Sequence, residues 1–83
     1  MALVLVGCGP IQYTVNITPA STALGEAESA GAKELAPFEY YYAEAHLEKA
    51  REEAAEASYE DAVRFAKTAK EYADRATTAA REK

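Results

Sequence analysis

Small and apolar residues recur along the second half of this chain with the spacing of a helix that buries one face. From Tyr40 onward they follow one another at intervals of three and four residues, and the rule resumes after a short break at Ser58 and Tyr59. Such spacing places every member on one side of an α-helix. We therefore predict two helices that fold back as a tight antiparallel hairpin. We call the residues through which the two helices should pack the seam; they are Tyr40, Ala43, Leu47, Ala50, Ala54, Ala57, Ala62, Ala66, Ala69, Ala73, Ala76 and Ala80.

A shorter helix is predicted before the hairpin, over residues 20 to about 30. Thr18 suits the N-cap, Pro19 suits the first helical position, and Gly31 favours a stop. Pro37 should then open the hairpin, because the residue before a proline is pushed away from helical backbone angles. The apolar face of the shorter helix contains Ala20, Ala23, Leu24, Ala27 and Ala30.

Residues 9–19 are interpreted as an extended linker. They combine β-branched residues with two prolines and show no helical period. The alternation of Tyr13, Val15 and Ile17 leaves one short strand as an alternative. That strand would need the sheet edge of a partner, because the chain offers no second strand.

Phe65 and Tyr72 lie seven residues apart on one flank of the last helix. Both rings are too large for a seam of alanines, so they need a separate surface. The shorter helix, with Leu24 and Leu35, is the nearest candidate and gives a three-helix bundle; a docking stripe for another protein is the alternative. The predicted fold is all-α: an alanine-rich antiparallel hairpin with a shorter third helix packed on it and an extended N-terminal tether, the helical domain covering residues 20–83.

Composition narrows the possible functions. A chain of 83 residues forms one small domain, whose core provides only marginal stability. The net charge is −5 and no block of Lys or Arg occurs, so a nucleic-acid backbone would be repelled. One Cys cannot form an internal disulfide, and one His far from it does not make a structural zinc site. We expect no metal, no cofactor and no nucleic-acid partner.

The sequence contains no recognisable arrangement of catalytic residues. His46 has no carboxylate or second histidine three or four residues away, so no ligand pair forms on its helix face. Serines and threonines occur without a glycine-rich turn or a partnering base, and there is no phosphate-binding loop. We predict that the protein is not an enzyme and expect no small-molecule substrate.

Glutamates recur every four residues along the first helix of the hairpin, at Glu44, Glu48, Glu52 and Glu56. Like charges at this spacing disfavour a helix slightly. We interpret the row as a solvated face; compensation by a cation or a basic partner is the alternative.

Three consecutive tyrosines follow Phe38 in the first turns of the hairpin. Successive residues of a helix fan out by about 100°, so these rings cannot all enter one core and at least one should be exposed. Because tyrosine is enriched at protein interfaces, the cluster is the best candidate for a partner-binding surface; ordinary capping of the bundle end is the alternative. The predicted partner-binding residues are Phe38, Tyr40, Tyr41, Tyr42, Phe65 and Tyr72.

Cys8 follows the apolar residues 2–6 and Gly7. This arrangement resembles the lipobox of bacterial lipoproteins, where the cysteine thiol is acylated and the peptide bond on its amino side is cut. The apolar run is too short to span a bilayer, which takes about 20 residues, so residues 1–8 are interpreted as a truncated lipoprotein signal. The alternative is a run of ordinary buried residues beside an unreactive cysteine.

A wider resemblance rests on Leu5-Val6-Gly7-Cys8, Gly31-Ala32, Ala36-Pro37, Leu47, Ala50, Ser58-Tyr59 and Ala62. In these features the chain resembles a family of uncharacterised, alanine-rich bacterial envelope lipoproteins, which are sometimes joined to an OmpA-like peptidoglycan-binding domain. The resemblance implies attachment to the membrane through lipid on Cys8. The Gly and Pro after this cysteine are similar to the outer-membrane pattern of lipoprotein sorting, which implies a lipid-anchored protein that faces the periplasm.

Two functional hypotheses follow. In the first, the protein is a non-enzymatic, membrane-anchored structural or assembly subunit that contacts an envelope protein or further copies of itself. In the second, it is a soluble module that binds a helix or a peptide through the tyrosine-rich surface.

Overall fold

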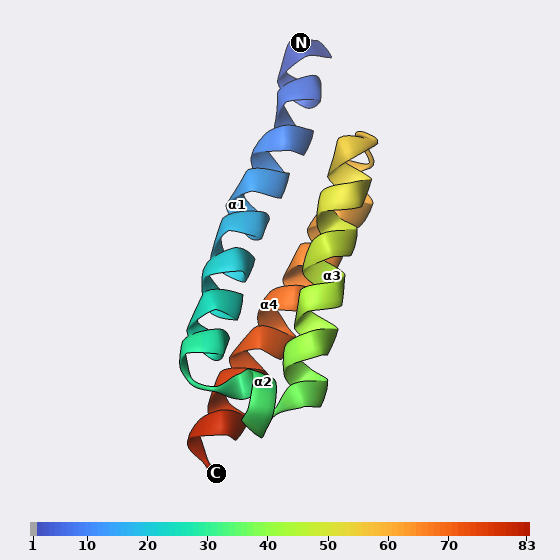
Figure 1. The fold of residues 1–83 in the computed structure, drawn as a ribbon. Helices are drawn as coiled ribbons and strands as arrows, with labels where there is room; N and C mark the ends of the chain where they lie inside the picture. The colour runs from blue at the N-terminus through green and yellow to red at the C-terminus, as the bar shows by residue number, and fades with distance from the viewer. Residues whose placement is uncertain (1) are drawn as a thin grey trace.

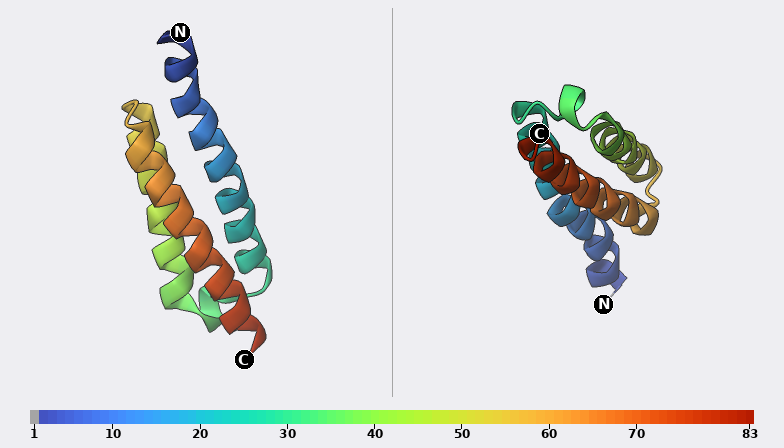
Figure 2. Two further views of the ribbon diagram at one scale, coloured as in Figure 1. Left: turned by 180° about the vertical axis from the view of Figure 1, so that it is seen from behind. Right: turned by 90° about the horizontal axis from the view of Figure 1, so that it is seen from below.

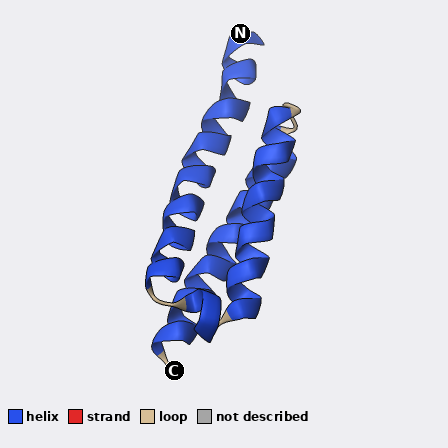
Figure 3. Cartoon of the chain, in the orientation of Figure 1, coloured by secondary structure: helices blue, strands red, loops and turns tan. Residues whose placement is uncertain are grey.

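The chain is helical along nearly its whole length (Figure 3). A computed structural model describes the backbone of residues 2–83 and the side chains from Gly9 onward. No strand occurs in the described residues, so the predicted all-α class is confirmed. The helices are α1 (Ala2–Ser29), α2 (Ala32–Leu35), α3 (Pro37–Ala55) and α4 (Tyr59–Arg81).

The three long helices form a rod that measures 52 × 16 × 14 Å along its principal axes. α1 and α4 run in one direction and α3 runs against them, as Figure 1 shows. α4 packs extensively on both α1 and α3, whereas α1 and α3 contact each other less. The end-on view in Figure 2 accordingly places α4 between the other two. The N-terminus and the C-terminus lie at opposite ends of the rod.

The extended linker predicted for residues 9–19 is wrong, and so is the short strand. The whole segment belongs to α1, which has Pro10 and Pro19 in its interior and does not start at Thr18. Its 28 residues also make α1 the longest helix described, not a shorter third one. A proline inside a helix costs about 3 kcal/mol because it removes a hydrogen bond and crowds the preceding turn.

Tertiary packing explains why α1 continues through its prolines. The Tyr13 ring lies 6.4 Å, between centroids, from the ring of Tyr59 at the start of α4. Gly9 lies so close to Tyr59 that a Cβ atom on it would approach the ring to 3.0 Å. Ile17 packs against the cluster of Ala20, Leu47 and Ala69. Helical propensity and proline rules are local, and contacts with a distant helix override them here.

The core consists of alanine layers that run along the rod. One layer joins Ala20, Leu47 and Ala69, and the next joins Ala23, Ala43 and Ala73, so that each layer takes one residue from each long helix. Among the described buried residues, Tyr40 and Leu47 alone are larger than alanine. The layer at the α2 end contains Ala27, Ala32, Ala36, Tyr40, Ala76 and Ala80.

The predicted seam is confirmed over most of its length. Every predicted member on α4 is buried, and so are the four members on α3 from Tyr40 to Ala50. The pattern ends as the helices separate: Ala54 is half-buried, and Ala57 is exposed in the turn between α3 and α4. The antiparallel hairpin therefore packs as its spacing indicates.

Backbone geometry defines the breaks that follow α1 and α3. Gly31 stands after α1 with a φ of 83°, the left-handed conformation that glycine adopts without strain. Ala57 adopts a φ of 63° after α3, where the Ala57 and Ser58 amides donate to the carbonyls of Ala54 and Glu53, at 2.9 and 2.8 Å. These are the two hydrogen bonds of a Schellman motif. Pro37 opens α3 as predicted.

Within the described part of the chain, none of the helices combines the length and the apolar character that crossing a bilayer requires.

Overpacking the seam should destabilise the domain. Ala69 is buried against Ala20 and Leu47, so Ala69→Leu adds atoms where neighbouring backbones already touch. Overpacking of this kind costs about 1–3 kcal/mol. Thermal and urea unfolding should show the loss, whereas Ala45→Leu, the same change at an exposed site on α3, should leave stability within about 0.5 kcal/mol. Equal tolerance at both sites would mean that the alanine rows do not form the core.

Tyr40 should make stability fall at alkaline pH. Burial, followed by the negative charge of Glu28, raises the pKa of Tyr40 above its ordinary value of 10.0. The unfolded chain therefore loses this proton first, and the stabilisation present below about pH 10 is lost as pH rises through the folded pKa. Thermal unfolding between pH 8 and 11.5 should show a flatter decline for Tyr40→Phe than for the wild type. A slope for Tyr40→Phe equal to that of the wild type would contradict the assignment.

Candidate functional site

Five aromatic rings from α3 and α4 gather on one surface of the hairpin. Phe38, Tyr42 and His46 follow one another at four-residue intervals along α3, and Phe65 and Tyr72 lie seven residues apart on α4. Both spacings keep side chains on one flank of a helix. We call these five residues the aromatic surface.

Tyr42 is the centre of the aromatic surface. Its ring stacks on His46 at 4.3 Å with an interplanar angle of 24°, and it lies 4.3 Å from the ring of Tyr72. Phe38 extends the row, at 5.5 Å from Tyr42 and edge-on to Tyr72 at 6.4 Å. At the other end, His46 lies 5.9 Å from Phe65. The rings thus form a continuous band across the two helices.

The band is open to solvent at its α3 edge. Phe38 is 65% exposed and Tyr42 is 37% exposed, while His46, Phe65 and Tyr72 are half-buried. Nδ1 of His46 lies 2.9 Å from the Tyr42 carbonyl oxygen. Because a carbonyl oxygen only accepts, Nδ1 is the nitrogen that carries the proton in this contact. The hydrogen bond and the stacking together fix the imidazole within the surface.

Two arginines border the aromatic surface on α4. The Arg75 guanidinium lies 4.6 Å from the centre of the Tyr72 ring and also donates to Glu71 at 2.7 Å. Arg64 lies 5.9 Å from the centre of Phe65 and donates to Asp61 at 2.7 Å. An arginine over an aromatic face is attracted to the ring, by about 0.5–1 kcal/mol at exposed sites. The border is therefore ordered and carries both signs of charge.

The tyrosine cluster predicted from the sequence is divided between the core and two surfaces. Tyr40 is only 2% exposed, so its assignment to a partner-binding surface is wrong. Tyr41 is 50% exposed but contacts the edge of Tyr40, at 5.1 Å between ring centres, and makes no ring contact with the aromatic surface. Phe38 and Tyr42 remain, together with Phe65 and Tyr72. The expectation that at least one ring of the cluster is exposed is confirmed.

Phe65 and Tyr72 do not lie on the surface that the sequence analysis predicts, which is the one against the first helix. Their ring contacts are with α3, not with the helix that contains Leu24. Leu24 packs instead on the buried alanines, and Leu35 is largely exposed. The physical reason is that alanine rows bring α1 against the inner side of α4, and the large rings stay on its other flank.

His46 is the member of the aromatic surface that sequence reasoning missed. The sequence indicates only that His46 has no metal-ligand partner on its own helix face. A signal was present, because His46 follows Tyr42 by four residues and Phe38 by eight. The partner rings on α4 were not assigned to the same flank, so the pattern was not recognised.

Some of the charged groups elsewhere pair on the surface. Lys49 contacts Glu53 at 3.4 Å and Glu52 at 3.8 Å, and Lys70 contacts Asp74 at 2.8 Å. No cluster of His, Cys, Asp or Glu in the described part of the chain has the arrangement to hold a metal ion. The lipid attachment predicted at Cys8 lies outside the described side chains.

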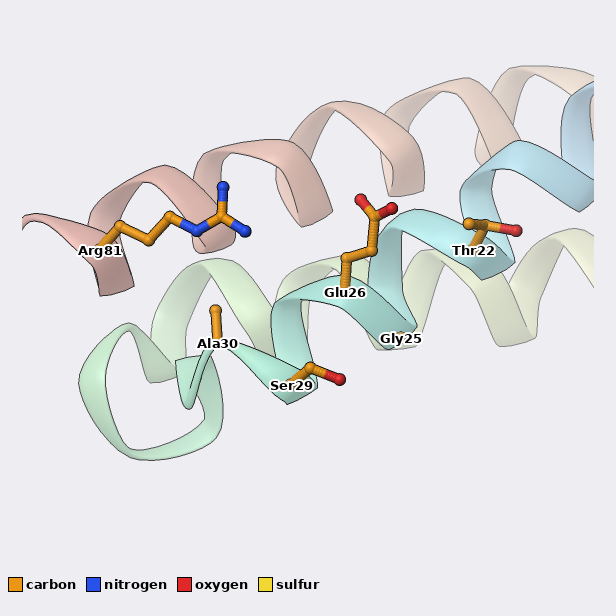
Figure 4. A pocket seen from close by; sticks show the side chains of 6 residues that line it. All are labelled: Thr22, Gly25, Glu26, Ser29, Ala30 and Arg81. Carbon is orange, nitrogen blue, oxygen red and sulfur yellow. The ribbon is translucent and has the colours of Figure 1, made fainter.

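A separate hollow lies between the end of α1 and the end of α4 (Figure 4). Arg81 of α4 and Glu26 of α1 extend into the space between the two helices, and Gly25 leaves the α1 side open. The remaining lining residues are Thr22, Ser29 and Ala30. The lining combines one acidic and one basic side chain with small residues, and no nucleophile contacts a base there.

Comparison with curated proteins and with solved structures gives no match. The family model of a domain of unknown function, DUF4398, matches residues 15–83, which include nearly all of the three-helix rod. The match begins inside α1, within the segment that the sequence analysis assigned to a linker. The chain therefore belongs to the DUF4398 family.

Proposed function

We propose that this chain is a non-enzymatic lipoprotein of the bacterial envelope. Lipid on Cys8 holds it on the outer membrane, and the helical rod acts on the periplasmic side as a structural or assembly subunit. The residues before Cys8, which resemble a lipobox, support the anchor. The aromatic surface supports the assembly role and is the observation on which the proposal chiefly rests.

An exposed band of rings is a surface suited to protein contact. The domain buries alanine and leaves Phe38 and Tyr42 in water, which forgoes the free energy of covering their apolar area. Aromatic residues and arginine dominate the energetically important positions of protein interfaces. Arg64 and Arg75 at the edge of the rings give the surface both components. A partner that covers Phe38 and Tyr42 would gain this unused burial.

The direction of α1 fits an anchor at its beginning. Its N-terminal end lies beyond the turn between α3 and α4, at one end of the rod (Figure 1). Phe38 and Tyr42 lie in the first turns of α3, toward the opposite end. A lipid at Cys8 would therefore leave most of the aromatic surface clear of the bilayer and accessible to a periplasmic partner.

The second candidate is a soluble module that binds a helix or a peptide through the aromatic surface. The same five rings favour it, since they form a band along a helical hairpin. It differs from the first candidate in having no lipid on Cys8. Attachment and recognition are therefore tested separately.

The anchor predicts processing at Cys8. Expressed from its native gene in a bacterial host, the protein should incorporate labelled palmitate, accumulate as a precursor in globomycin and fractionate with outer membranes. Cys8→Ala should abolish the label. Loss of labelling without loss of folding, checked by circular dichroism, is expected because the substitution removes only the acylated atom. A soluble, unlabelled wild-type product would contradict the anchor and leave the soluble module as the function.

Adjacent tyrosines provide a matched test of the aromatic surface. Tyr42→Ala should lower the yield of envelope cross-links by at least about tenfold, as expected for a central aromatic residue of an interface. Tyr41→Ala removes a similarly exposed ring from the other flank of α3 and should leave the cross-links unchanged. Thermal unfolding of both variants separates binding from stability. Equal effects, or none, would rule out the aromatic surface as the interface.

A further inference from the structure

A second surface lies on the exposed side of α1, and none of its own residues is charged. Its members are separated by alternating intervals of four and three residues, the spacing of the a and d positions of a coiled coil. All of them are exposed, and the two apolar members, Ile11 and Val15, are each 63% exposed. We call this surface the outer α1 face; it comprises Ile11, Val15, Thr18, Thr22, Gly25 and Ser29.

The distribution of charge separates this face from the rest of the surface. The nine basic and 14 acidic residues all lie at Glu26 or beyond it. The exposed sides of α3 and α4 carry charged residues, some of them in ion pairs such as Lys49–Glu53 and Lys70–Asp74. At a net charge of −5, two copies of the chain repel each other. From Ile11 to Gly25 the outer α1 face brings no charge to a contact between copies, so this repulsion is least there.

The shape of the outer α1 face permits close approach of another helix. A Cβ atom added to Gly25 would meet nothing within 4 Å, so the chain itself leaves this position open. Thr18, Thr22 and Ser29 add only short side chains. Thr22, Gly25 and Ser29 also line the hollow that Glu26 and Arg81 enter (Figure 4), so charged groups border the C-terminal end of the face. A helix that packs on this face would contact short side chains along most of its length and the branched side chains of Ile11 and Val15 at one end.

We propose that the outer α1 face pairs with the same face of a second copy of this chain, with the two α1 helices parallel. Parallel pairing brings Ile11 to Ile11 and Val15 to Val15, whereas antiparallel pairing would set them against Ser29 and Gly25. Val15 and Thr22 occupy a positions, where β-branched residues favour two strands. Two apolar residues per copy bury little area, so the dimer is weak. It requires neither the lipid nor the aromatic surface.

Sedimentation equilibrium of the full chain with Cys8→Ser, from micromolar to millimolar concentration, should show a monomer–dimer equilibrium. Val15→Glu places two like charges opposite each other and should raise the dissociation constant at least about tenfold. Glutamate favours a helix more than valine does, so the fold should persist, as circular dichroism can verify. Ala45→Glu adds the same charge on α3 and should leave the equilibrium unchanged.

Cross-linking tests the orientation in the same Cys8→Ser background. Val15→Cys should give oxidised dimers, because parallel pairing brings the two residues within disulfide distance. Glu48→Cys, on the exposed surface of α3, should not. A purely monomeric chain, or equal disruption by Val15→Glu and Ala45→Glu, would overturn the proposal. So would cosedimentation of the monomer with phosphatidylglycerol vesicles that Val15→Glu abolishes, since the face would then bind lipid.

Discussion

The close approach of helices through alanine is the constraint on which the rest of this structure depends. Layers such as Ala23, Ala43 and Ala73 bring one residue from each long helix into contact. A seam of this kind leaves no space for large rings, with Tyr40 at the wider α2 end as the exception. The hairpin therefore carries Phe38, Tyr42 and Tyr72 on its outside, and the aromatic surface is a direct consequence of how the core is packed.

α4 is the helix that joins the other two long helices into one rod. It contacts both α1 and α3, and each of its six buried alanines joins the seam. The first half of α1 depends on this arrangement, since Tyr59 at the start of α4 packs against Gly9 and Tyr13. The segment next to Cys8 is in this way coupled to the fold of the domain.

The two surfaces of the rod have different chemistry and lie on different elements. The aromatic surface is bordered by arginines and carboxylates, which suits a partner with its own polar rim. The outer α1 face has no charge over its first turns and suits an equally uncharged helix. Because α4 lies between α1 and α3, occupation of one surface leaves the other free. If both proposals hold, one copy of the chain has room to contact a second copy and another protein at the same time.

The sequence by itself determined the elements that a local period specifies: the alanine seam of α3 and α4, the opening of α3 at Pro37 and the stop at Gly31. It also indicated which aromatic residues do not fit among alanines. Only the tertiary structure decided that residues 9–19 are helical, because Tyr59 and Leu47, far along the chain, stabilise turns that Pro10 and Pro19 disfavour locally. It likewise placed Tyr40 in the core and brought His46 and Tyr42 against Phe65 and Tyr72. The helical period of a sequence shows on which side of its helix a residue lies. It does not show which other helix packs against that side.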